Sequence, residues 1–310
     1  MGARLADGGV TTHLMWRRYR DLENRNTITR ALLRIDLRLR GNRFLMHRVV
    51  YPAADLLCVV RRPALWRLHR RLRRHLAAQR AQWRNPYSDN YFYQGLERIG
   101  LHGGKPSEAR LAKYGISDLL TTDLQVLDIG SNCGFWALSI APFVKHVDGV
   151  ELNPHLNAIA EDTKAFLAIR NATFHTADFG AFAPAKRYDR VFSLSNHQTI
   201  DGNSSLHFPQ YVERIWSVMR DGGLLLFESH NVWGPGEGGA GDDGDLEEKF
   251  RLVSRYFTLL RYKMIECFYP ADIDKLFAVF RKKAAVTEPD LSFDLSAARN
   301  RYEFASPPAG

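Results

Sequence analysis

The chain has 310 residues, of which 45% are hydrophobic, 25% charged and 12% aromatic, and its formal net charge is +9. This composition is typical of a folded protein with one large domain or two smaller ones, and it excludes disordered, collagen-like and purely coiled-coil chains. The three cysteines, Cys58, Cys133 and Cys267, are too few and too scattered for a disulfide framework or a paired-thiol zinc site, which predicts a reducing compartment.

Positive charge is concentrated in residues 1–84, which hold 20 arginines, no lysine and five acidic residues. Apolar residues recur there at helical spacing in two stretches, one with Ile28, Leu32, Ile35 and Leu39, the other with Leu65, Leu68, Leu72 and Leu76. We expect an extension of arginine-rich amphipathic helices. Three interpretations remain open: the helices pack on the body of the protein, adhere to an anionic membrane surface, or bind nucleic acid.

No run of the sequence reaches the roughly 18 uncharged apolar residues that a membrane-spanning helix requires. The N-terminus also lacks the order of basic start, apolar stretch and small-residue cleavage site that marks a secretory signal. We therefore expect a cytoplasmic protein, with residues 1–84 as the candidate for peripheral attachment to the inner face of the membrane.

Residues 85–119 form a tyrosine-rich, glycine-punctuated linker and cap segment. The aromatic run Tyr91, Phe92 and Tyr93, followed by Gln94, has two interpretations. It forms a wall of an acceptor site, or it is the apolar face that seats the linker on the next domain.

From residue 120 to residue 282 the chain alternates short apolar runs with helical ones, which predicts an α/β domain with a doubly wound sheet. We expect strands at Gln125–Ile129, His146–Val150, Ala172–Phe174, Asp189–Leu194, Leu224–Phe227, Thr258–Phe268 and Lys275–Phe280. Helices are expected at Phe135–Pro142, Pro154–Ile169 and Gln210–Met219, with one more after the glycine-rich acidic stretch that follows the fifth strand. Residues 283–310 are a C-terminal tail, which we expect to be loosely attached.

The strongest motif is VLDIGSNCGFWALSIA, residues 126–141, in which an apolar strand carries Asp128 near its tip and a glycine turn leads directly into a helix. Gly130 and Gly134 allow positive φ and a close approach of the backbone to a ligand. Asn132 stands where glycine is common, and asparagine tolerates the left-handed region better than most residues.

Polar residues follow the next strands at the distances that a nucleoside site requires. Glu151 ends the second strand, where an acidic residue accepts both hydroxyls of a ribose. Asp178 and Phe179 follow the third strand and suit the edge and face of an adenine, and Ser195 follows the fourth. All these positions lie at the carboxyl edge, where open α/β sheets bind their ligands.

Two kinds of cofactor suit such an edge. A nicotinamide dinucleotide requires G-x-G-x-x-G, but the series from Gly130 reads Gly130, Asn132, Phe135, so two of its glycines are missing. A cofactor without phosphates that is cationic at sulfur and ends in an amino acid needs only a glycine turn with a nearby carboxylate.

These residues together resemble the class I S-adenosylmethionine-dependent methyltransferases over about residues 120–282. The resemblance implies a Rossmann-like seven-stranded sheet with an antiparallel last strand and S-adenosyl-L-methionine as cofactor. It also implies the cofactor-binding residues Asp128, Gly130, Asn132, Gly134, Glu151, Asp178, Phe179 and Ser195. Asp128 and Gly130 would lie by the methionine moiety, Glu151 at the ribose, and Asp178 with Phe179 at the adenine. The strings SLSNHQTIDGN and LLLFESHN are similar to a bacterial subgroup that modifies surface glycans and natural products.

Candidate catalytic residues follow the fourth and fifth strands, over the position of the transferred methyl group: His197, Asp201, Glu228 and His230. Histidine titrates near neutral pH and suits a general base. The same four residues alternatively coordinate a divalent metal ion, although no metal is our main expectation. Residues 233–248 are expected to form a lid over the acceptor or a plain surface loop.

The sequence predicts O-methylation of a hydroxyl on a small molecule or a saccharide, with a lipid-linked saccharide among the candidates, because the loop that family members use for nitrogen methylation is missing after the fourth strand. Two alternatives remain: an RNA methyltransferase that uses the basic arm to hold phosphates, and a noncatalytic, membrane-associated partner subunit. Nucleic acid is the less favoured partner because the predicted catalytic body is acidic. The oligomeric state and the acceptor are not predicted.

Overall fold

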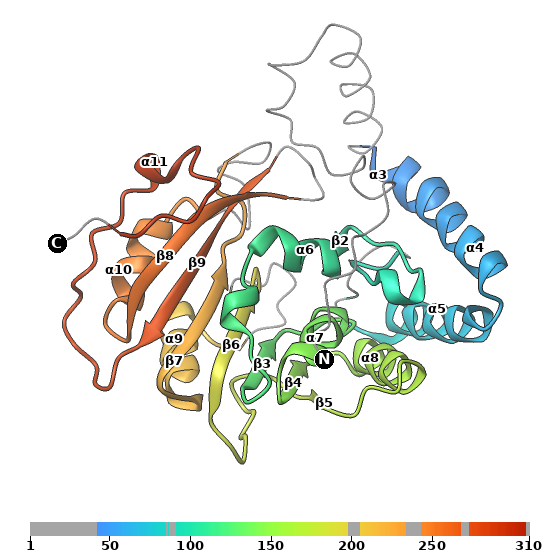
Figure 1. The fold of residues 1–310 in the computed structure, drawn as a ribbon, viewed down its shortest axis with the longest axis horizontal. Helices are drawn as coiled ribbons and strands as arrows, with labels where there is room; N and C mark the ends of the chain where they lie inside the picture. Colours follow the sequence, from blue (N-terminus) through green and yellow to red (C-terminus); the bar gives the residue numbers. More distant parts are fainter. Residues whose placement is uncertain are drawn as a thin grey trace, which may run out of the picture.

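The computed structural model describes residues 42–84, 86, 91–197, 205–233, 243–267 and 273–307. At its centre lies a seven-stranded sheet (Figure 1). Its strands are β3 (Gln125–Ile129), β4 (His146–Glu151), β5 (Ala172–Thr176), β6 (Tyr188–Leu194), β7 (Met219–Glu228), β8 (Phe257–Glu266) and β9 (Asp274–Lys282). Each strand overlaps one of the seven runs predicted from the sequence.

The strands lie in the order β5-β4-β3-β6-β7-β9-β8. β3 to β7 pair in parallel, and β9 runs antiparallel to both of its neighbours, β7 and β8. The predicted fold class, a Rossmann-like sheet of the methyltransferase type with one antiparallel strand, is therefore confirmed. A separate two-stranded ribbon joins β1 (Gln94–Gly95) to β2 (Lys105–Pro106).

The central strands are apolar on both sides because helices cover both faces of the sheet. Val126 and Leu127 are adjacent in β3 and fully buried, yet they belong to two different hydrophobic clusters. Phe192 and Val191 of β6 divide in the same way. Alternate side chains of a strand point to opposite faces, so one short apolar run supplies two cores.

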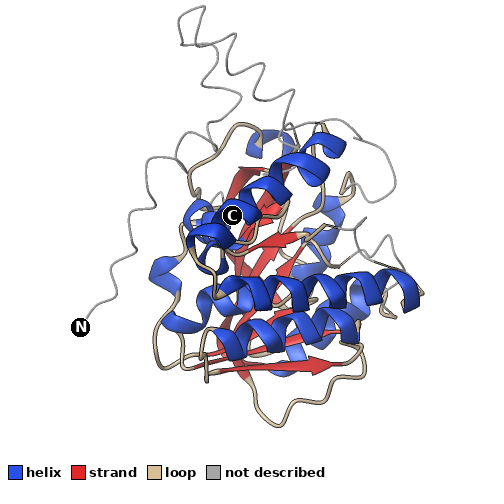
Figure 2. Ribbon diagram, turned by 90° about the vertical axis from the view of Figure 1, so that its right-hand side faces the viewer, coloured by secondary structure: helices blue, strands red, loops and turns tan. Residues whose placement is uncertain are grey.

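Helices lie on both sides of the strands (Figure 2). One face packs against α6 (Ser107–Tyr114), α7 (Phe135–Ile140) and α8 (Pro154–Phe166), and the other against α9 (Phe208–Val218) and α10 (Leu246–Val253). Single turns of 3₁₀ helix occur at η3 (Glu97–Ile99), η4 (Ser117–Leu119) and η5 (Ala141–Phe143). The helices predicted at 135–142, 154–169 and 210–219 thus all form.

The described N-terminal segment consists of α3 (Arg43–Leu45), the π-helical η2 (Met46–Val50), α4 (Tyr51–Arg61) and α5 (Leu65–Gln82). α5 lies against α8, and its four leucines 65, 68, 72 and 76 are at most 4% exposed. Arg71 and His75 both pair with Asp162 of α8. The amphipathic pattern in α5 therefore serves packing on the body, whereas the pattern predicted around residues 28–39 lies outside the described residues.

The C-terminal tail is not loosely attached, contrary to our expectation. Tyr262 of β8 exchanges two backbone hydrogen bonds of 2.9 Å with Ala305, and the Met264 amide donates to the Arg301 carbonyl. Phe293 and Ala298, on either side of the start of α11 (Leu295–Ala298), are at most 8% exposed. The tail covers a sheet edge whose backbone groups need partners, a requirement that its own sequence does not reveal.

None of the helices in the described ranges combines the length and apolarity of a transmembrane segment.

Candidate functional site

The carboxyl ends of the parallel strands meet at one edge of the sheet. β3 lies between β4 and β6, at the point where the strand order reverses, and open α/β sheets bind ligands at this point. The Glu151 carboxylate at the end of β4 accepts a hydrogen bond of 2.9 Å from the Asn132 amide in the turn after β3. Ser195 after β6 donates to Glu228 at the end of β7 at 2.5 Å. Residues predicted at four separate strand tips therefore meet in two pairs, Asn132 with Glu151 and Ser195 with Glu228, whereas Asp201 lies outside the described residues.

The turn after β3 holds three residues in the left-handed region: φ is 62° at Gly130, 53° at Asn132 and 70° at Gly134. A Cβ atom at position 134 would lie 2.5 Å from the Ala160 Cβ, so only glycine fits there. Asn132 takes the same region, and its Oδ1 accepts a hydrogen bond of 2.9 Å from the Cys133 amide. Asparagine thus replaces the expected glycine because its side chain bonds the backbone locally.

We expect Asn132→Gly to leave the free energy of unfolding within about 1 kcal/mol of the parent, and Asn132→Val to lower it by about 1–2 kcal/mol or more. Valine pays the steric penalty of the left-handed region and loses the bond to the Cys133 amide. Urea denaturation measures both changes. Equal stability of the two variants would show that positive φ at this position is not a requirement.

Asp128 is buried at 3% exposure, and its Oδ2 has no hydrogen-bond partner in the described structure. Burial raises the pKa of this carboxyl to about 8, a shift that Arg110 opposes and Glu151 increases. An unpaired buried carboxyl group is costly to the fold. Its position beside the glycine turn therefore indicates a site for a cationic or hydrogen-bond-donating ligand.

The other predicted cofactor residues extend from Asp128 along the same edge. Glu151 accepts from two backbone amides, those of Asn132 and Asn153, each at 2.9 Å, and so fixes the turn against β4. Asp178 accepts from the Gly180 amide at 2.6 Å. Phe179 presents its ring edge-on to Tyr211, with centroids 5.6 Å apart. The carboxyl edge of the sheet thus presents the carboxylates of Glu151 and Asp178 and the half-buried ring of Phe179.

Glu228 lies in a buried polar cluster on one side of the edge. Its carboxylate accepts a hydrogen bond from Tyr114, and it pairs with Arg110 at 3.4 Å and Lys275 at 3.5 Å. Burial raises the pKa of Glu228, but Arg110 and Lys275 outweigh burial and hold the pKa well below its usual range. Glu228 is therefore a weak base, and it positions Ser195, whose Oγ also accepts from Lys275 at 2.6 Å.

His197 lies on the other side and is coupled to Asp243. The His197 Nε2 is 3.1 Å from the Asp243 carboxylate, and neither side chain is exposed. Asp243 also accepts from Lys249 and from the His230 amide, and burial raises its pKa but His197 and Lys249 hold the pKa below its usual range. Because an ionised carboxylate only accepts, Nε2 carries a proton, so Nδ1 is the nitrogen that holds the lone pair whenever the ring is neutral. Nδ1 has no partner among the described residues.

His230 stacks edge-on with His197 at a centroid distance of 4.9 Å. Burial, followed by His197 and Lys275, lowers the pKa of His230 to about 3. His230 is therefore neutral at physiological pH and a weaker base than an exposed histidine. The two predicted histidines come together, but with different electrostatic roles.

Within the described residues, no group of three or more His, Cys, Asp or Glu side chains is arranged to hold a metal ion. The carboxylate of Glu228 faces Arg110 and Lys275. Of the three candidate metal ligands that the structure describes, only His197 and His230 lie side by side.

The predicted lid is described only at its ends, Trp233 and residues 243–248. Trp233 forms an antiparallel bridge with Asp274, and the guanidinium of Arg299 lies over its ring at 5.2 Å. The Asp243 amide donates to the Asn231 carbonyl at 2.8 Å. Both described ends of the segment are therefore held close to the carboxyl end of β7.

Several residues of the site were missed by the sequence analysis: Asn196, Tyr211, Arg110, Tyr114 and Asp243. Asn196 accepts from Tyr211 at 2.8 Å and bonds the Ile129 carbonyl, which links β6 to β3. The i, i+4 spacing of Arg110 and Tyr114 placed both on one helical face and was an available signal. Asp243, within an acidic glycine-rich stretch, carried no local signal.

Two residues of the linker, Phe92 and Gln94, attach it to the domain in different ways. Phe92 is 2% exposed and packs against Phe135, so it seats the linker on the domain. Gln94 donates to the Ser131 carbonyl at 3.3 Å and accepts from the Phe135 amide at 2.9 Å. Gln94 therefore braces the glycine turn and the first amide of α7.

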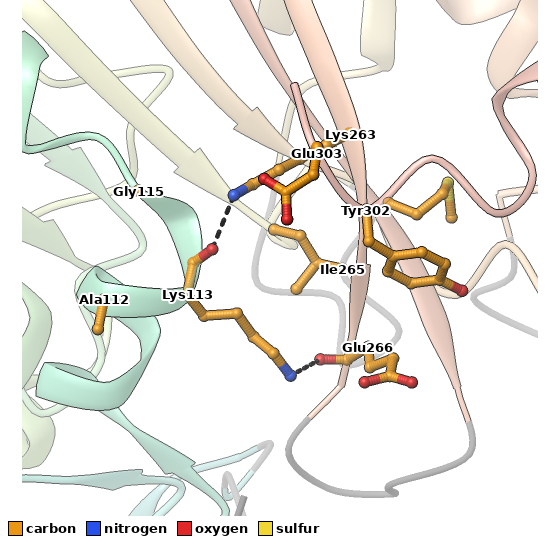
Figure 3. A pocket seen from close by; sticks show the side chains of 9 residues that line it. Ala112, Lys113, Gly115, Lys263, Ile265, Glu266, Tyr302 and Glu303 are labelled. Atoms are coloured by element: carbon orange, nitrogen blue, oxygen red, sulfur yellow. Dashed lines mark hydrogen bonds between the residues drawn. The ribbon is translucent and has the colours of Figure 1, made fainter. Parts of the chain in front are cut away.

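A separate cavity of about 260 Å³ lies between α6, β8 and the tail (Figure 3). Lys113 donates to the Glu266 carbonyl at 2.6 Å and Lys263 to the Lys113 carbonyl at 2.8 Å across this space. None of the site residues predicted from the sequence lines it.

No protein-family model matches the chain, and no curated protein matches it. Among solved structures, it is similar to the N-methyltransferase NodS from Bradyrhizobium japonicum WM9 in complex with S-adenosyl-L-homocysteine, with 16% identity, 68% of this chain and 98% of that chain covered, and a TM-score of 0.45. It is also similar to the [4+2]-cyclase SpnF, with 16% identity, coverage of 59% and 84%, and a TM-score of 0.46. An rRNA methylase from Streptococcus thermophilus gives 15% identity, coverage of 58% and 98%, and a TM-score of 0.42. Identities this low do not transfer an activity from one chain to another.

Proposed function

We propose that this chain is an S-adenosylmethionine-dependent methyltransferase that methylates a hydroxyl of a small molecule or saccharide. The observation that carries the proposal is the buried Asp128 carboxyl beside the glycine turn, at the point where the strand order reverses, whose Oδ2 has no hydrogen-bond partner among the described residues. A ligand with an ammonium group and a nucleoside satisfies this carboxyl and the acidic residues beyond it. A diphosphate brings like charge to the same carboxylates and fits poorly.

The residues of the edge fit the proposed cofactor from one end to the other. Asp128 would accept from its ammonium group, Glu151 would accept from the ribose hydroxyls, and Asp178 with Phe179 would hold the adenine edge and face. The backbone amides of Asn132 and Asn153 bond the two carboxylate oxygens of Glu151, one at each, and so hold Glu151 at the carboxyl end of β4.

When bound, the cofactor supplies a methyl group on a positively charged sulfur. The chain must then align the acceptor hydroxyl and remove its proton. We assign the proton to Nδ1 of His197, the ring nitrogen that can accept it when the ring is neutral and that has no partner among the described residues. Asp243 fixes the ring through Nε2 and stabilises the imidazolium that forms, as in other histidine–carboxylate couples. The His197–Asp243 pair favours a hydroxyl acceptor, since a neutral amine attacks the methyl group without a general base.

The test combines binding with transfer. Calorimetry with S-adenosylmethionine measures affinity, and incubation with the methyl-labelled cofactor and fractionated cell extract shows which fraction accepts label. We expect measurable binding and label in the small-molecule, glycan or lipid fraction. Label in the RNA fraction would show that the acceptor is RNA and not a small molecule or saccharide. Failure to bind the cofactor would refute the proposal outright.

A further inference from the structure

The outward side of the N-terminal segment is apolar. Eight large hydrophobic side chains are exposed in the described residues, and six of them fall between residues 44 and 66. We call these six residues the α4 surface, because α4 holds three of them and the other three lie in the helices on either side: Phe44, Val49, Leu56, Leu57, Val60 and Trp66, with exposures of 50–73%. Such a concentration of apolar surface in one segment is typical of an interaction site.

α4 is anchored by its polar side. Tyr51 and Asp55 face inward, and Asp55 pairs with Arg73 at 2.6 Å and with His102 at 2.9 Å. Leu56, Leu57 and Val60 lie at i, i+1 and i+4 and share the opposite face. In Figure 1, α4 lies at the right-hand margin of the molecule, above α5. The helix therefore holds its apolar stripe away from both hydrophobic cores.

The charge of the same segment is uniformly positive at the surface. Residues 42–84 contain eleven arginines, and their single acidic residue is Asp55, which is buried. Arg48, Arg61 and Arg67 are exposed and adjoin the apolar residues in sequence. Apolar side chains flanked by arginine suit a surface of anionic lipid headgroups, which accepts both.

We propose that the α4 surface docks on an anionic lipid membrane, with its apolar side chains inserted at the interface and the arginines at the headgroups. Charge disfavours two other occupants. Residues 1–41 carry nine arginines against four acidic residues, so they repel this surface, and a second copy would present the same positive charge. The proposal does not depend on methyl transfer.

Sedimentation of the full-length protein with vesicles tests this docking. We expect binding to vesicles of phosphatidylglycerol and phosphatidylcholine, weak binding to phosphatidylcholine alone, and loss of binding as salt rises. The triple variant Leu56→Ser, Leu57→Ser, Val60→Ser should bind anionic vesicles at least tenfold more weakly with an unchanged melting temperature. The matched control is Phe166→Ser with Val286→Ser, which removes exposed apolar residues outside the α4 surface and should bind as the parent does.

Three outcomes would overturn the proposal. The parent protein sediments with neither kind of vesicle. The triple variant melts several degrees lower, which shows that another part of the chain covers the surface. The parent is a dimer in analytical ultracentrifugation and the triple variant a monomer, which assigns the surface to a second copy.

Discussion

Asp128→Asn is expected to weaken S-adenosylmethionine binding by about 10- to 100-fold, because a buried hydrogen bond to a charged group contributes about 1.5–3 kcal/mol. Asparagine keeps the size of the side chain but cannot supply the negative charge that an ammonium group requires. Isothermal titration calorimetry measures the change in Kd.

The same substitution should change how stability depends on pH. The folded carboxyl keeps its proton to a pKa of about 8, whereas the unfolded chain releases it near the usual pKa of 3.8. Between these two values unfolding releases a proton, so the free energy of unfolding falls as pH rises, by up to about 1.4 kcal/mol per pH unit. Asp128→Asn removes this decline, and the variant should gain stability relative to the parent between pH 6 and pH 8.

Asp148→Asn is the matched control for Asp128. Asp148 is equally buried in the neighbouring strand β4, but its carboxylate is paired with Tyr188, His175 and Lys186. Its replacement should lower stability and leave the affinity for the cofactor unchanged. If both variants bind as the parent does, Asp128 does not contact the cofactor and the proposed site is wrong.

His197→Gln is expected to lower kcat by about 10²- to 10⁴-fold, the usual contribution of a general base, with little change in cofactor affinity. Glutamine keeps a hydrogen-bonding side chain beside Asp243 but cannot accept and release a proton. Single-turnover transfer of a labelled methyl group measures the loss, once the labelled fraction has supplied an acceptor.

Asp243→Asn tests the coupling rather than the base itself. An asparagine at this position lacks the negative charge that stabilises the imidazolium of His197, so kcat should fall. His230→Gln should have a smaller effect on kcat, because the pKa of His230 is already lowered to about 3.

The control for the histidines is His175→Gln. His175 also pairs with an aspartate, Asp148, but in β5 and away from Asp243. The His175→Gln variant should keep the kcat of the parent. Unchanged kcat in both His197→Gln and Asp243→Asn would show that the acceptor needs no base from this pair, as expected for an amine acceptor.

The sequence by itself determined the central sheet and the edge at which we propose that the cofactor binds. Apolar runs of strand length alternating with helical spacing specify a doubly wound sheet, since each pattern encodes its own periodicity. Asp128, Glu151 and Asp178 were assigned to one edge because parallel strands all end at the same side. The turn from Gly130 to Gly134 was visible because few residues adopt positive φ.

Only the tertiary structure decided which distant residues complete the site. Asp243 meets His197 across 46 positions, and Arg110 meets Glu228 across 118, through contacts between elements that no local pattern links. The tail was expected to be loose, yet β8 takes it as a partner for its edge, and α4 carries its apolar stripe outward although the same periodicity buries α5. Periodicity fixes the face of a helix or strand, but the pairing of faces depends on the whole chain, because burial is a property of the assembled fold.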